Sequence, residues 1–286
     1  MKYRIFTKRQ FAARVVLYLA VLVMLAFTAL PLIYVVFTAF KPIDELLRFP
    51  PTFFVSRPTL TNFSDLVATL GSSEVPFLRY TFNSVLTTVV TVILSVIVCC
   101  MGAYGIVKHN VPFSDFIFMI IISALMFSGH VTQISNYMIV NSLGFVDTYL
   151  ALIIPKIAVA FNFFLIKQFI EQLPDAYLEA ARIDGASEIT IFLKIVVPYL
   201  KPAIATLAIF SFVNNWNDYF SPLVFITKQQ LKTLPLALQS IGEGGNVARA
   251  GAMAAATFLM TLPTIVVFAS MQKNVIQTMA HSGIKA

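Results

Sequence analysis

Long apolar runs with almost no charge constrain this chain more than any other feature. Six runs in the 286-residue sequence are of this kind, and only two of them contain a charged residue, Lys156 in one and Asp218 in another. A helix needs about 20 mostly apolar residues to cross a bilayer core of about 30 Å, because unpaired backbone groups cannot face lipid. With 58% hydrophobic and only 12% charged residues, the chain is predicted to be an all-α integral membrane protein. The six predicted transmembrane helices are Val15–Phe40, Tyr80–Val107, Phe116–Val146, Thr148–Ile166, Pro202–Thr227 and Ala250–Gln272.

The positions of lysine and arginine predict the orientation of these helices. An even number of spans places both termini on one side, and twelve of the 20 basic residues fall on that side, against seven on the other. The positive-inside rule therefore predicts that both termini are cytoplasmic. The net charge of +7 fits anionic lipid better than nucleic acid. The expected organisation is a cytoplasmic segment 1–14, one membrane domain 15–275 and a cytoplasmic tail 276–286 of a multi-pass protein.

The segment 167–201 concentrates charge between two apolar runs. Crossing a bilayer requires no such insertion, which favours a docking surface for a soluble partner. Pro174 and Asp175 are typical of a helix start, Gly185 of a left-handed stop, and Ser187 of the cap of a second helix. We therefore predict two short helices with a bend at Gly185. The charged residues of this segment are Glu171, Asp175, Glu179, Asp184 and Glu188, with Lys167, Arg182, Lys194 and Lys201.

A spaced motif lies in the same segment. Glu179-Ala180-Ala181 is followed after three residues by Gly185 and after nine more by Ile195-Val196-Val197-Pro198. This pattern resembles the signature of the membrane subunits of ABC importers, Glu-Ala-Ala, three residues, Gly, nine residues, then Ile-x-Leu-Pro. Only Val197 departs from it, conservatively. Leu178–Ser187, Trp216-Asn217-Asp218 and Thr233-Leu234-Pro235 are similar to the carbohydrate-uptake branch, in particular to the second membrane subunit of maltose-type systems.

The resemblance implies a type I ABC importer permease fold and a transport function in the bacterial plasma membrane. It implies four kinds of partner: a second homologous permease, two ATP-binding subunits, an extracytoplasmic sugar-binding protein and the transported sugar, for which an oligosaccharide is favoured. ATP and Mg would bind to the ATP-binding subunits, and this chain would be a non-catalytic subunit without a cofactor. In agreement, Gly242, Gly244 and Gly245 lack the Lys and Ser or Thr of a phosphate loop. The residues expected to contact the ATPase are Glu179, Ala180, Ala181, Asp184, Gly185, Ala186 and Ser187.

Polar residues within the apolar runs are the candidates for the solute pathway. Such residues are costly in lipid and should face protein or water, and amides, carboxylates and aromatic rings are the groups that bind sugars. Hydrogen bonding between helices is the structural alternative. For Lys156 we expect a side chain that reaches the lipid headgroups, with a buried ion pair as the alternative. The pathway candidates are Asn214, Asn215, Trp216, Asn217 and Asp218, with Asn136, Tyr137 and Asn162 as weaker ones, together with Asn83.

Three alternatives compete with this interpretation: two other functional classes, and the same class with a different cargo. A secondary transporter would need ionisable residues in its spans for ion coupling, and Lys156 and Asp218 are nearly all that these runs contain. An intramembrane serine protease could use Ser187 and His281, but Ser187 lies in the charged loop, away from any membrane cavity. An ABC importer permease for a non-sugar solute is the nearest alternative, because the loop motif is common to importers. The scattered histidines predict no metal site.

Overall fold

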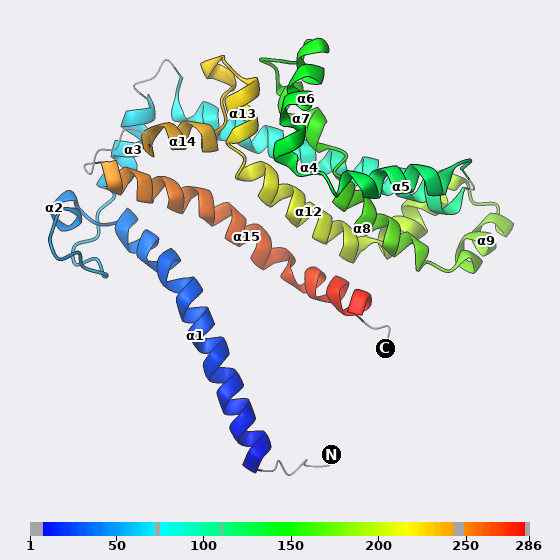
Figure 1. The fold of residues 1–286 in the computed structure, drawn as a ribbon, viewed down its shortest axis with the longest axis horizontal. Helices are drawn as coiled ribbons and strands as arrows, with labels where there is room; N and C mark the ends of the chain where they lie inside the picture. Colours follow the sequence, from blue (N-terminus) through cyan, green and yellow to red (C-terminus); the bar gives the residue numbers. More distant parts are fainter. Residues whose placement is uncertain (1–7, 72–74, 110, 243–248, 284–286) are drawn as a thin grey trace. The chain divides into compact units, whose positions relative to one another are not determined.

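The computed structural model describes residues 8–71, 75–109, 111–242 and 249–283, without the side chains of 8–13, 71, 130, 241–242 and 274–283. Gly244, Gly245 and the last three residues thus lie outside the described part, as does the side chain of His281. The described residues form helices and no strand (Figure 1). Within the described residues, three helices are long and apolar enough to cross a membrane, namely α1 (Lys8–Ala39), α4 (Phe77–Lys108) and α15 (Ala250–Gly283). This number rises to at most five when two bent pairs are each counted as one span, namely Tyr149–Lys156 with Ala160–Glu171 and Glu188–Tyr199 with Lys201–Trp216.

Three of the predicted continuous helices are wrong, because the structure divides each run. Phe116–Val146 separates into α5 (Ser114–Ala124) and α6 (Gly129–Ser142), with Ser128 in an extended conformation before Gly129. Thr148–Ile166 separates into α7 (Tyr149–Ile153), the short 3₁₀ helix η1 (Ile154–Lys156) and α8 (Ala160–Glu171), which bend by 42°. Pro155 lies at this break, where its missing N–H weakens the helix.

The third division occurs in the predicted run Pro202–Thr227. Here α12 (Lys201–Trp216) ends at the polar cluster, and α13 (Phe220–Phe225) follows. One carboxylate oxygen of Asp218 accepts hydrogen bonds from the backbone N–H groups of Phe220 (3.0 Å) and Ser221 (3.1 Å). A side chain that caps the start of a new helix in this way competes with continuation of the old one.

The chain divides into two compact units, and the first contains residues 1–69 and 241–259. It holds α1, α2 (Ile43–Leu46), most of α3 (Thr61–Gly71) and the first part of α15. The buried Asn62 amide donates to the carbonyl oxygens of Ala39 (2.9 Å) and Lys41 (2.7 Å) and thereby fixes α3 to the end of α1. Gly251 approaches Asn62 so closely that an added Cβ would lie 2.1 Å from its Oδ1.

The second unit contains residues 70–240 and 260–286 and holds both candidate sites. In it α4, α8 and α12 pack against one another (Figure 1). The contact face of α4 is rich in small polar side chains, a composition that allows membrane helices to approach closely. The buried polar residues of α4 are Asn83, Ser84, Thr87, Thr88, Thr91 and Ser95. The remaining elements are α9 (Asp175–Ile183), α10 (Glu188–Ile191), the π-helix η2 (Phe192–Val196), α11 (Val197–Tyr199), η3 (Gln229–Leu231) and α14 (Leu234–Gly242).

Candidate functional site

The segment 167–201, which we call the coupling loop, has the bend between two helical parts that the sequence predicts, and its second part continues from α10 through η2 and α11. The first helix, α9, ends at Ile183 with Asp184 as its C-cap, and Gly185 then adopts a left-handed conformation with φ +81°. The backbone N–H of Ala186 donates a hydrogen bond to the carbonyl oxygen of Ala181 (2.9 Å), which caps the carboxyl end of α9. Ser187 Oγ accepts a hydrogen bond from the Thr190 N–H (3.4 Å) at the start of α10. The predicted bend and cap are therefore confirmed.

One face of the coupling loop belongs to the main hydrophobic core of the second unit. Leu178 and Ile191 are almost completely buried there, in one cluster with residues of α4, α8 and α12. Ala181 and Ala186 pack against the same cluster. We expected the bend to present Ala181 together with Ala180, but only Ala180 is exposed, because Ala181 lies on the inner face of α9.

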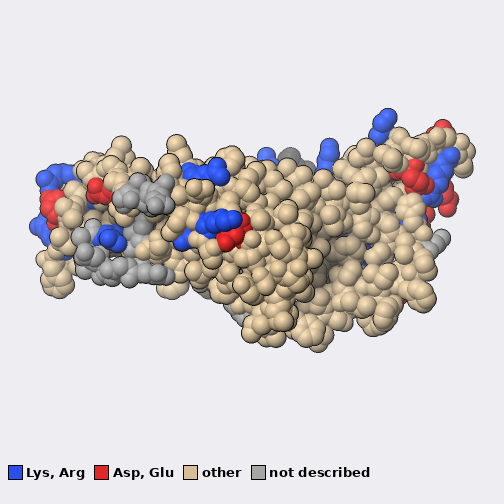
Figure 2. Space-filling model, turned by 90° about the horizontal axis from the view of Figure 1, so that it is seen from above, with Lys and Arg blue, Asp and Glu red and all other residues tan. Residues whose placement is uncertain are grey.

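The opposite face of the coupling loop is open and carries the rest of the predicted contact set. Glu179, Asp184, Gly185 and Ser187 are exposed, together with Ala180. Three large apolar side chains that the sequence analysis did not select also lie on the surface, namely Tyr177 (62% exposed), Ile183 (86%) and Ile189 (73%). Tyr177 precedes the motif, and Ile183 and Ile189 lie within it on either side of Gly185, so apolar residues in a charged loop were the available signal. This face therefore combines charge with exposed apolar area, and its charged groups gather at the end of the unit that holds α9 (Figure 2).

Polar contacts fix the coupling loop to the end of α4. Lys108 Nζ donates to Asp175 Oδ1 and to the carbonyl oxygen of Leu173, each at 2.7 Å. Tyr104 Oη donates to Glu188 Oε2 (2.9 Å), and Arg182 Nε donates to Glu188 Oε1 (2.8 Å). One residue of α10 thus joins α9 to α4. Together with the shared core, these contacts attach the coupling loop to α4 at several points.

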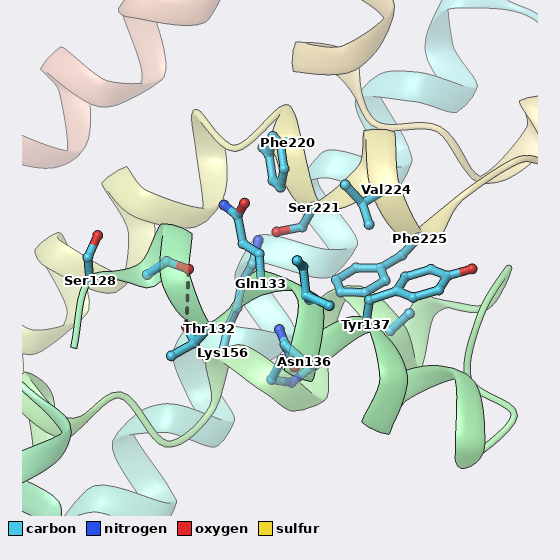
Figure 3. A pocket seen from close by; sticks show the side chains of 14 residues that line it. Ser128, Thr132, Gln133, Asn136, Tyr137, Lys156, Phe220, Ser221, Val224 and Phe225 are labelled. Carbon is cyan, nitrogen blue, oxygen red and sulfur yellow. Dashed lines mark hydrogen bonds between the residues drawn. The ribbon is translucent and has the colours of Figure 1, made fainter.

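The second candidate site is a cavity of about 760 Å³ between α6, the α7–α8 break and α13. It is lined by the predicted residues Asn136 and Tyr137, and by Gln133 and Lys156 (Figure 3). The Tyr137 ring stacks on the Phe225 ring with centroids 6.1 Å apart and planes within 2°. The complete lining is Ser128, Gly129, Thr132, Gln133, Ile134, Asn136, Tyr137, Ala151, Pro155, Lys156, Phe220, Ser221, Val224 and Phe225.

The polar cluster of α12 does not line this cavity. Trp216 is 5% exposed, its indole N–H donates to the Met260 carbonyl oxygen (3.0 Å), and its ring stacks on Phe212. The Asn215 and Asn217 amides donate to carbonyl oxygens one turn earlier in α12, and Asn214 is exposed. Trp216 therefore makes a hydrogen bond between helices, which was the structural alternative to a place in the solute pathway.

The weaker candidates Asn83 and Asn162 also make structural contacts. Asn83 is fully buried, and its amide donates to the carbonyl oxygens of Gln230 and Lys232 while accepting from Tyr149 Oη. Asn162 is 3% exposed and lies 3.4 Å from Ser95 Oγ. Both residues connect helices of the second unit.

Lys156 and Asp218 form an ion pair that joins two helix breaks. The two side chains are 24% and 15% exposed, and each lies where a predicted span is interrupted. The expectation that Lys156 reaches the lipid headgroups is therefore wrong, and the ion pair given as its alternative is present. The reason is that Asp218, which the sequence places 62 residues away, comes within contact distance only through the fold.

Asp147 positions the segment that follows α13. It accepts hydrogen bonds from the backbone N–H groups of Thr227 (2.6 Å) and Lys228 (3.0 Å), and from the Thr227 hydroxyl. The Thr227 hydroxyl, followed by the Lys228 N–H, holds the pKa of Asp147 below its usual value. The turn between α6 and α7 is thus joined to the end of α13, whose residues form one wall of the cavity.

The comparisons with known proteins identify the family. Residues 88–281 match the family described as the binding-protein-dependent transport system inner membrane component. The chain is 33% identical over 273 residues to protein LplC of Bacillus subtilis (strain 168), covering 91% of this chain and 90% of the relative. It is 29% identical over 270 residues to the arabinooligosaccharides transport system permease protein AraQ of Halalkalibacterium halodurans, covering 91% and 93%.

A solved structure has the same fold. It is a chain from a crystal structure of a bacterial ABC transporter involved in the import of the acidic polysaccharide alginate, with a TM-score of 0.82, 21% identity and coverage of 95% of this chain and 99% of that one. Together with the loop motif and the apolar helices, these similarities show that this chain belongs to the binding-protein-dependent transport system inner membrane components, the membrane permease subunits of ABC transporters.

Proposed function

We propose that this chain forms half of the translocation pathway of an ATP-driven saccharide importer and receives the movement of the ATPase through residues 175–198. The observation that carries the proposal is the two-faced coupling loop. Its inner face shares a core with α4, α8 and α12, while its outer face exposes Glu179, Ala180 and Gly185. A surface that is open to a partner and rigidly joined to membrane helices can transmit a rigid-body movement.

The same proposal includes six membrane crossings with both termini in the cytoplasm. The three long helices supply three crossings, α7 with α8 supplies the fourth, α12 the fifth, and α5 with α6 the sixth. The exposed apolar side chains of α1 indicate that this helix faces lipid, since Met24 and Phe27 are 70% and 79% exposed. The domain boundaries 1–14, 15–275 and 276–286 remain our prediction, and α15 extends helically into the last of these segments.

The partners in this proposal are a second homologous permease, two ATP-binding subunits and an extracytoplasmic binding protein. The family description, which names dependence on a binding protein, supports the last of these. ATP and Mg would be bound by the ATP-binding subunits. The chain is a non-catalytic subunit in this scheme, in keeping with its family of transport components.

The cargo is proposed to be a saccharide, in particular an oligosaccharide. AraQ, whose name refers to arabinooligosaccharides, is similar over nearly the whole chain, and the cavity presents Asn136, Gln133 and the ring of Tyr137. Amides with an aromatic face suit sugar hydroxyls and ring C–H groups. The alternative is an ABC importer for a non-sugar solute, which the coupling loop would serve equally well.

Cross-linking tests the docking surface. Ala180→Cys places a thiol on the exposed face of α9, whereas Leu178→Cys places one in the core two residues away. In vesicles that contain the whole transporter, a short thiol cross-linker should join Ala180→Cys to the ATP-binding subunit and leave Leu178→Cys unjoined. Absence of a cross-link from Ala180→Cys in an assembled, active complex would remove the coupling assignment.

A further inference from the structure

The cavity described above contains a single charged side chain among its described lining residues, that of Lys156. A volume of about 760 Å³ is in the range of sites that bind small molecules. Figure 3 shows Lys156, Gln133 and Ser221 with their polar ends directed toward the same part of the cavity. An unpaired ammonium group in this place would attract a carboxylate. The charge balance around Lys156 therefore decides which class of saccharide the cavity can accept.

The charge of Lys156 is already neutralised by Asp218. The two side chains form an ion pair at a position that is largely shielded from water. Asp218 cannot easily turn away, because its other carboxylate oxygen accepts the Phe220 and Ser221 backbone hydrogen bonds. If a ligand carboxylate paired with Lys156 in place of Asp218, the Asp218 carboxylate would be unpaired and poorly hydrated, and it would lie beside a second anion. Such an arrangement is strongly unfavourable. The ammonium group of Lys156 is therefore not available to bind a carboxylate of the ligand.

The remaining polar groups of the cavity are neutral and both donate and accept. They comprise the amides of Gln133 and Asn136 and the hydroxyls of Ser128, Thr132 and Ser221. The Thr132 hydroxyl donates to the Gly129 carbonyl oxygen (3.1 Å), which leaves its lone pairs to accept (Figure 3). Sugar hydroxyls likewise donate and accept. The stacked rings of Tyr137 and Phe225 add an apolar surface for the face of a sugar ring.

We propose that this cavity is a binding site for neutral saccharides and that the Lys156–Asp218 ion pair excludes acidic ones. The inference rests on the proposed function and refines it by naming the class of cargo. The proposed cargo thus differs in charge from that of the transporter of similar fold, which is described as importing the acidic polysaccharide alginate. Lys156 and Asp218 act here as specificity-determining residues, since releasing the ammonium group would convert the site into one for anions.

The test is direct binding of two matched probes to the purified permease–ATPase complex without the binding protein, so that only the membrane site selects. The probes are galactotriose, which is neutral, and trigalacturonate, its carboxylate counterpart, each followed by calorimetric titration. The wild-type complex should bind galactotriose at least about tenfold more tightly. Asp218→Asn keeps an acceptor for the Phe220 and Ser221 N–H groups and frees Lys156, and should tighten trigalacturonate binding at least about tenfold. The double variant Lys156→Gln/Asp218→Asn should lose this gain.

Asp44→Asn is the matched control, because Asp44 is also paired with a basic residue, Arg57, but belongs to the first unit and does not line the cavity. It should leave the preference between the probes unchanged. Equal wild-type affinity for both probes would overturn the proposal even if Asp218→Asn failed to assemble, and so would an assembled Asp218→Asn complex without the gain. If the complete importer transports neither probe nor any other saccharide in a panel, the proposed function itself fails. Transport of both classes with unchanged preference in Asp218→Asn would overturn only the charge-selection proposal.

Discussion

Replacing Lys108 by methionine should loosen the attachment of α9 to α4. The Lys108 side chain is 7% exposed and makes two charge-assisted hydrogen bonds, one to the Leu173 carbonyl oxygen and one to Asp175, which is 71% exposed. The bond to Asp175 is mostly in water and should contribute about 0.2–1 kcal/mol. The shielded bond to the carbonyl oxygen should contribute about 1.5–3 kcal/mol. We therefore expect Lys108→Met to lower the free energy of local opening of α9 by about 2 kcal/mol and Asp175→Asn by less than about 1 kcal/mol.

Amide hydrogen exchange in the purified complex measures this free energy. A loss of about 2 kcal/mol corresponds to roughly 30-fold faster exchange of the α9 amides, and a loss below about 1 kcal/mol to less than about fivefold. Exchange in the middle of α4 should not change. Lys194→Met, an exposed lysine of the same loop, is the control and should leave α9 unaffected. Equal acceleration in Lys108→Met and Asp175→Asn, or none in either, would refute the assignment of the main contribution to the buried carbonyl contact.

Three further substitutions test the coupling loop, the first unit and the turn at Asp147. Glu179→Lys reverses an exposed charge on the docking face and should leave the complex assembled while ATP hydrolysis proceeds without uptake; wild-type coupling in reconstituted vesicles would contradict this, and Glu179→Gln should be milder. Gly251→Ala places a Cβ 2.1 Å from Asn62 Oδ1 and should cost about 1–3 kcal/mol of stability by overpacking, lowering the thermal unfolding midpoint. Gly105→Ala, which meets nothing within 4 Å, should not lower it. Because hydrogen bonds depress the pKa of Asp147, its stabilisation is complete above its unfolded pKa of about 3.9 and disappears as pH falls through the folded value. The gap in unfolding midpoint between wild type and Asp147→Asn should therefore be present at pH 7 and close below about pH 4; a gap independent of pH would argue against it.

The bend and the helix cap of the coupling loop could be predicted because both depend on local chemistry. A glycine accommodates φ +81° where other residues are strained, so Gly185 marked the bend. A hydroxyl before a helix accepts an N–H from its first turn, so Ser187 marked the cap. The side of α9 that faces the core was harder to predict. Ala180 and Ala181 are adjacent and chemically identical, and only the position of the core decides that Ala181 packs and Ala180 is exposed.

The apolar runs located the helices, because the cost of charge in lipid acts on composition and needs no knowledge of neighbours. Breaks within those runs were not located, except where Pro155 could have indicated one. The interruption after Trp216 depends on Asp218, whose carboxylate caps α13 and pairs with Lys156 from a distant part of the chain. The interruption before Gly129 has no proline to mark it.

By itself the sequence determined the helical membrane architecture, the bent loop and the family motif, because hydropathy and turn chemistry act over a few neighbouring residues. Only the tertiary structure decided which polar residues share a cavity. Asn136 and Tyr137 meet Lys156, Ser221 and Phe225 across three helical segments, whereas Trp216 turns inward to the Met260 carbonyl oxygen. The physical reason is that a binding site and a buried ion pair both depend on contacts between segments far apart in the chain, which no local pattern encodes.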